Sequence, residues 1–134
     1  MKNILELSHV EKIYGEKENQ VKALKDINIQ VREGEFIAIV GTSGSGKSTL
    51  LNLVGGLDTP TKGKILVKGK EIGSLTRKEL TIFRRRNIGF VFQNYSLMPV
   101  LNVYDNVALP VTFDKGKHIN RKYIEELLKE LGIW

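Results

Sequence analysis

The sequence predicts an α/β fold built around a phosphate-binding loop. Residues 36–40 are an unbroken apolar run, typical of a strand buried on both faces. The next nine residues fit the G-x-x-x-x-G-K-[ST] pattern of such loops, and residues 50–54 are apolar at helical spacing. An antiparallel β layer before the loop and a partial parallel core sheet around it complete the predicted fold.

Each residue type in the loop has a physical reason. The glycines permit main-chain angles that a side chain forbids, so N–H groups can approach phosphate oxygens. The helix that begins near Gly46 directs its positive end at the same anion. Lys47 suits the β- and γ-phosphates, and the Ser48 hydroxyl suits Mg²⁺. The loop consists of Gly41, Thr42, Ser43, Gly44, Ser45, Gly46, Lys47, Ser48 and Thr49.

Length and composition indicate one globular domain. The chain has 134 residues, 41% hydrophobic and 27% charged, with no cysteine. It has no apolar window long enough to span a bilayer and no apolar signal segment at the N-terminus. The net charge of +6 favours anionic partners. Residues 84–86 are the densest basic cluster, but no interleaved aromatics accompany them, which favours a solvated helix face over a nucleic-acid-binding surface.

The segments before the loop predict a β layer. Residues 3–10 form a short strand that leads into a polar turn at 16–20. Residues 26–32 alternate apolar and polar side chains, which predicts a half-buried antiparallel strand. Residues 33–35 turn the chain into the buried strand at 36–40.

The segments after the loop continue the predicted core. Residues 57–63 read as a loop and 64–68 as a short strand, and the capping box Thr76–Glu79 predicts a helix over 77–86. Residues 88–92 are a second buried-type strand that ends at Gln93. Because ligands of open α/β sheets lie at the carboxyl ends of the strands, we expect Gln93 to reach the bound nucleotide.

The C-terminal part is predicted to be helical. Residues 94–103 form a loop, and residues 105–111 form a helix that Pro110 bends or ends. The last helix carries one apolar stripe and stops at Gly132. The stripe consists of Ile124, Leu127, Leu128 and Leu131.

With Tyr14, the loop and Gln93 together, the chain resembles the ATP-binding subunit of an ABC transporter along essentially its whole length. The closest subgroup is the lipoprotein-release, macrolide-export and antimicrobial-peptide-resistance ATPases. Asp105 departs from that group, which more often has Glu there. Further matching segments are residues 21–27, 34–36, 55–58, 60–61 and 84–93.

The resemblance implies ATP and Mg²⁺ as cofactors. Tyr14 would stack on the adenine ring, Lys47 and the loop amides would hold the phosphates, and Thr49 would add a phosphate contact. Ser48 and Gln93 would ligate Mg²⁺, and Gln93 would also approach the attacking water. Lys47 and Gln93 are thus the implied catalytic residues. Residues 1–93 would form the β layer and phosphate-loop core, and residues 94–134 the start of the helical subdomain.

The resemblance also implies partners and a location. These are a membrane permease subunit, a second ATP-binding subunit in a homodimer formed on ATP binding, and the inner face of the cell membrane, to which the cytoplasmic subunit would be peripheral. The exported substrate would be a peptide, a lipoprotein or a drug-like molecule. Two alternatives remain open: a nucleotide-binding fragment without turnover, and a soluble ABC-type ATPase that acts on nucleic acid or ribosomes.

The sequence departs from the family in its chemistry. The Leu-Ser-Gly-Gly-Gln signature, the apolar strand ending in Asp-Glu and the switch histidine are not found in it, and neither His9 nor His118 follows an acidic strand end. We therefore expect an incomplete nucleotide-binding domain over residues 1–134, with the hydrolytic half absent. Such a domain would be marginally stable alone, or the N-terminal part of a longer or split protein.

Overall fold

A computed structural model describes residues 2–134 in two compact units. The first unit ends at Gly89, and the second comprises Phe90–Trp134. Each unit has its own group of buried apolar side chains. The two units are therefore described one after the other.

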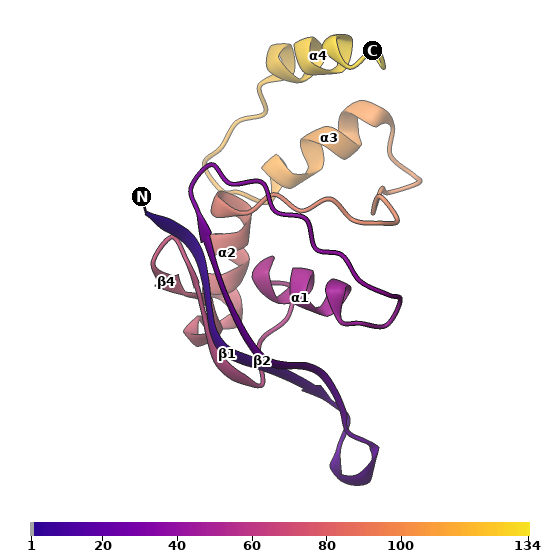
Figure 1. The fold of residues 1–134 in the computed structure, drawn as a ribbon. Coiled ribbons are helices and arrows are strands. Elements are labelled where there is room, and N and C mark those ends of the chain that lie inside the picture. Colours follow the sequence, from indigo (N-terminus) through magenta and orange to yellow (C-terminus); the bar gives the residue numbers. More distant parts are fainter. Residues whose placement is uncertain (1) are drawn as a thin grey trace. The chain divides into compact units, whose positions relative to one another are not determined.

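The first unit is built on a four-stranded antiparallel sheet (Figure 1). Its strands are β1 (Asn3–Tyr14), β2 (Val21–Arg32), β3 (Lys62–Val67) and β4 (Lys70–Glu71), in the spatial order β2-β1-β3-β4. The predicted antiparallel layer is confirmed. Its first two strands are longer than predicted because they pair almost to the turn that joins them, where a short 3₁₀ helix covers Lys17–Asn19.

A bulge in β1 explains how two residues three positions apart are both buried. Strict alternation would place Leu7 and Val10 on opposite faces of the sheet. The register with β2 shifts between them, from Leu7 opposite Ile29 to Val10 opposite Ile27, and His9 inside the bulge has a φ of 49°. The extra residue turns Val10 back to the core face, so both side chains are buried.

Two helices supply the rest of the core of this unit. They are α1 (Lys47–Val54) and α2 (Arg77–Asn87), and a 3₁₀ turn over Ile72–Ser74 precedes α2. The predicted capping box is present: the Thr76 side chain accepts from the Glu79 amide, and the Glu79 carboxylate accepts from the Thr76 amide. The buried core consists of Leu7, Val10, Leu24, Leu50, Leu53, Ile65, Val67, Ile72, Leu80 and Phe83.

The strands predicted at residues 36–40 and 88–92 are not formed, so the partial parallel core sheet is not present among residues 2–134. Phe36 is 96% exposed, Val40 86% and Val91 94%. A parallel strand requires hydrogen-bonded neighbours on its edges and helices over its faces. Neither apolar segment pairs with another strand in the described part of the chain, and the four strands that do pair form an antiparallel sheet.

The second unit contains α3 (Val103–Thr112) and α4 (Arg121–Glu130). Ala108, Ile124 and Leu128 are buried together, with Tyr104 packed against them. Helix α3 begins two residues before the predicted start and continues past Pro110 to Thr112. No helix within residues 2–134 has the length and apolar character needed to cross a membrane.

Candidate phosphate-binding site

The predicted phosphate-binding loop, residues 41–49, overlaps the start of α1, and its Gly46 is a glycine that no other residue could replace without strain. Gly46 caps the helix in the left-handed region, with φ at 95°. A Cβ on Gly46 would lie 2.7 Å from the carbonyl oxygen of Ala23 in β2. Gly44 is also left-handed, with φ at 78°. Glycine at position 46 therefore brings the start of α1 against the main chain of β2.

The N-terminus of α1 differs from those of the other α-helices. The side chains of Thr76, Asn102 and Asn120 cap α2, α3 and α4 by accepting from main-chain amides. Helix α1 has no side-chain cap and no acidic residue in its first turn. Since the first amides of a helix have no acceptor within it, those of α1 can donate to an external anion.

The Lys47 side chain is turned back onto the loop. Its ammonium nitrogen lies 2.7 Å from the carbonyl oxygen of Gly41, 2.6 Å from that of Thr42 and 3.2 Å from the Ser45 hydroxyl. The positive charge of Lys47 therefore lies against residues 41–45 of the loop. Ser48 and Thr49 follow in the first turn of α1, where Ser48 is exposed and Thr49 is half-buried. The arrangement of amides, an ammonium and a hydroxyl fits a polyphosphate with a divalent cation.

Tyr14 is placed near the loop by strand pairing. It is the last residue of β1 and pairs with Val21 of β2, two residues from Ala23, whose carbonyl oxygen meets Gly46. The Tyr14 side chain is partly exposed, and its hydroxyl donates to Oδ2 of Asp58 at 3.1 Å. The fold thus brings the predicted base-stacking residue and the start of α1 to the same end of the β1–β2 hairpin.

Asp58 and Lys12 are two neighbours of Tyr14 for which no role was predicted. The Lys12 ammonium donates to Oδ1 of Asp58 at 3.0 Å and to the Thr59 carbonyl oxygen at 2.8 Å. Burial raises the pKa of Asp58, but hydrogen bonds from Lys12, the Thr59 amide and Tyr14 outweigh it, so its pKa lies below the usual value of 3.8. In the sequence, Asp58 falls within the family-matching segment 55–58 and the loop predicted at residues 57–63.

Gln93 belongs to the second unit. It is exposed in a turn over residues 93–96, and no strand precedes it. Because the loop belongs to the first unit, the approach of Gln93 to the loop stays a prediction, as does a metal held by Ser48 and Gln93. No group of three His, Cys, Asp or Glu side chains suited to a metal occurs in residues 2–134. Both histidines are exposed.

Comparison with known proteins gives one consistent family. The profile described as "ABC transporter" matches residues 24–134. The macrolide export ATP-binding/permease protein MacB of Mannheimia succiniciproducens is 44% identical over 98% of this chain and 20% of its own length. The bacitracin export ATP-binding protein BceA of Halalkalibacterium halodurans is 44% identical over 98% of this chain and 52% of its own length.

A solved structure agrees with these relatives. The ATP-binding cassette MJ0796, in a dimeric post-hydrolysis state bound to ADP and Pi, has a TM-score of 0.85 and 43% identity. The match covers 93% of this chain and 56% of that one, so the present chain spans about half of that cassette. The exporter names agree with the subgroup that the sequence motifs indicate. Profile, relatives and fold all lead to the same assignment: the chain belongs to the ABC transporter family.

Proposed function

We propose that this chain is the ATP-binding module of an exporter-type ABC transporter and that it binds Mg-ATP at residues 41–49. The observation that carries the proposal is the start of α1, where Gly46 closes the loop against β2, no side chain caps the helix and the Lys47 ammonium is held over the loop. The cassette MJ0796, bound to ADP and Pi, supports the same ligand class.

Different residues would bind the phosphates and the base of the nucleotide. Amides of the loop and of the first turn of α1 would donate to phosphate oxygens, and the Lys47 ammonium would exchange its carbonyl partners for the β- and γ-phosphates. Thr49 would add a phosphate contact, and the Tyr14 ring would stack on adenine. The ammonium starts within about 3 Å of the Gly41 and Thr42 oxygens, so this exchange needs only a local movement of the side chain.

The metal site and the hydrolytic role are part of the same proposal. Ser48 and Gln93 would ligate Mg²⁺, which when bound neutralises charge on the phosphates. Gln93 would also orient the attacking water. It would further relay the nucleotide state to the membrane subunit. We assign residues 1–93 to a β layer and phosphate-loop core, and residues 94–134 to the start of the helical subdomain.

The names of the relatives support the proposed partners. MacB and BceA are named for export of macrolides and bacitracin, and MJ0796 is a dimeric cassette. We therefore assign a membrane permease as one partner and a second ATP-binding subunit as the other, with the chain peripheral to the cytoplasmic face of the membrane. The transported substrate would be a peptide, a lipoprotein or a drug-like molecule that the permease selects.

One preparation can separate this function from its alternatives. Affinity for Mg-ATP and the rate of phosphate release are measured on the same sample, and the molar mass is followed by light scattering with and without ATP. ATP binding with an ATP-dependent dimer supports the proposed module, and phosphate release from the same sample would show that this chain also turns ATP over. Binding without release supports a nucleotide-binding module without turnover. Retention of nucleic acid or ribosomes in place of membrane protein would contradict the transporter role.

A further inference from the structure

The side chains around Tyr14 form a connected group that the proposed phosphate site does not use. Lys12 has a side chain only 12% exposed, and that of Asp58 is 35% exposed. An ammonium this far out of water needs compensating partners, and Lys12 has two, the Asp58 carboxylate and the Thr59 carbonyl oxygen. Its nitrogen also lies 5.0 Å from the centroid of the Tyr14 ring. The Asp58 carboxylate therefore accepts hydrogen bonds from both the Lys12 ammonium and the Tyr14 hydroxyl.

Asp58 connects this group to the helix that follows the phosphate-binding loop. Its amide donates to the carbonyl oxygen of Asn52 in α1 at 3.3 Å, and the Leu57 amide donates to the same oxygen at 2.8 Å. One Asp58 oxygen, Oδ2, accepts from the Tyr14 hydroxyl, while Oδ1 accepts from Lys12 and from the Thr59 amide. Asp58 thus joins the end of β1, through its carboxylate, to the end of α1, through its main-chain amide.

Thr61 also joins the segment that contains Asp58 to β1. The Thr61 hydroxyl accepts from the amide of Ile13 at 2.9 Å, and the Thr61 amide donates to the carbonyl oxygen of Glu11 at 2.8 Å. The loop before β3 is therefore hydrogen-bonded to β1 at Glu11 and Ile13, immediately before Tyr14. The Tyr14 hydroxyl then has a partner that is itself fixed at three points, which restricts the ring to one orientation.

We propose that Asp58, with Lys12, is a positioning residue that holds the Tyr14 ring in the orientation needed to stack on the base of a bound nucleotide. This inference rests on the proposed nucleotide-binding function and adds to it a means of base recognition. A ring that is held in place before binding loses less conformational freedom when the base arrives, so the free energy of stacking is retained in the affinity. Phosphate contacts do not involve this group.

The test compares two ligands on the intact 134-residue chain. Dissociation constants are measured by calorimetry for Mg-ATP and for magnesium tripolyphosphate, which has the phosphates without the base. Tyr14→Phe keeps the ring but removes the bond to Asp58, and Asp58→Asn removes the charge that holds Lys12. For each variant we expect ATP affinity to fall roughly threefold to tenfold, with tripolyphosphate affinity changed by less than about twofold.

The double variant distinguishes positioning from general support of the fold. Tyr14→Ala removes the ring and should weaken ATP roughly tenfold or more. If Asp58 acts through Tyr14, then adding Asp58→Asn to Tyr14→Ala causes no further loss of ATP affinity. Asp26→Asn is the matched control, because it removes a carboxylate from β2 that pairs with His9 at 2.7 Å and does not contact Tyr14. It should leave both affinities unchanged.

The outcomes separate this inference from the function on which it rests. If the unmodified chain binds ATP and both Tyr14→Phe and Asp58→Asn leave the ratio of the two affinities unchanged, positioning by Asp58 is wrong and nucleotide binding stands. Equal loss of ATP and tripolyphosphate affinity would show that Asp58 merely supports the fold, which also overturns the inference. If the unmodified chain binds neither ligand, the proposed function itself is wrong.

Discussion

The guanidinium of Arg84 in α2 donates to the carbonyl oxygen of Gly56, just after α1, with Nη1 and O separated by 2.9 Å. A Cβ on Gly56 would meet the Arg84 side chain at 3.1 Å and that of Leu80 at 3.2 Å, so the two helices approach closely there. A cation at this end of α1 also complements the helix dipole. The sequence predicted a solvated face for Arg84, and that prediction is wrong, because the side chain is partly buried at this junction.

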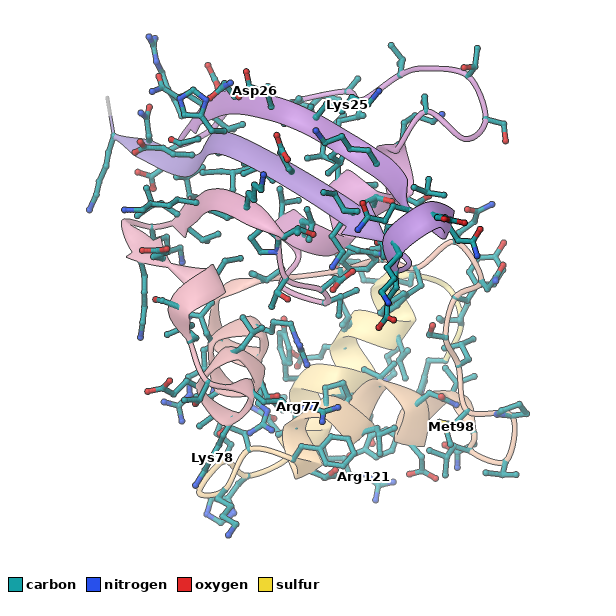
Figure 2. All side chains as sticks on the ribbon, turned by 90° about the horizontal axis from the view of Figure 1, so that it is seen from below. Lys25, Asp26, Arg77, Lys78, Met98 and Arg121 are labelled. Atoms are coloured by element: carbon teal, nitrogen blue, oxygen red, sulfur yellow. The ribbon has the colours of Figure 1, made fainter. Side chains whose placement is uncertain are left out.

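Replacement of Arg84 should therefore destabilise the first unit. Arg84→Ala leaves the Gly56 carbonyl without its charged donor, and we expect the free energy of unfolding to fall by about 1–3 kcal/mol in a urea titration. Lys78→Ala is the control, because Lys78 is an exposed residue near the start of the same helix (Figure 2). It should change the free energy by less than about 0.5 kcal/mol. Equal effects of the two substitutions would contradict the proposed role of the junction.

The contact between Gly46 and β2 gives a second prediction. Gly34 and Gly46 both have positive φ, 85° and 95°, but a Cβ on Gly34 meets nothing within 4 Å, while one on Gly46 lies 2.7 Å from the Ala23 carbonyl oxygen. Gly34→Ala should cost only the left-handed backbone, about 1–2 kcal/mol. Gly46→Ala should cost clearly more and should also weaken ATP binding, because the start of α1 must move. Similar urea midpoints for both variants would argue against close contact with β2.

The acid dependence of stability provides a third prediction. The pKa of Asp58 in the folded chain lies below 3.8, so its ionised form stabilises the fold above the pKa of the unfolded chain. This contribution is lost as the pH falls from the unfolded value through the folded one. We expect the difference in unfolding free energy between the unmodified chain and Asp58→Asn to be constant above about pH 5 and to shrink below that. A difference that grows on acidification would have the wrong sign.

Local signals in the sequence predicted local structure well. The capping box at Thr76 and Glu79 gave the start of α2, and the glycine-rich motif gave the start of α1, because each depends on residues a few positions apart. The apolar run at residues 36–40 predicted a buried strand and was misleading. Apolarity shows that a segment can be buried, but a strand also needs neighbours, and these come from elsewhere in a chain.

The contacts of the candidate site show the same division between local and distant information. The loop could be recognised from nine consecutive residues. The bond between Tyr14 and Asp58 joins positions 44 residues apart, and that between Lys12 and Asp58 joins positions 46 apart. No spacing rule relates such residues, since their distance is set by how β1, α1 and the connection to β3 pack. The bulge at His9, which brings both Leu7 and Val10 into the core, was missed for the same reason.

The proposed function depends on binding of a triphosphate by residues 41–49 and the Lys47 ammonium. Calorimetric titration of Mg-ATP into the unmodified chain and into Lys47→Ala tests it most directly. We expect saturable heat for the unmodified chain, and either no binding or an affinity lower by about one to two orders of magnitude for Lys47→Ala, since a charge-assisted contact with phosphate is lost. No heat from the unmodified chain at millimolar Mg-ATP, or equal affinity for the two proteins, would contradict it.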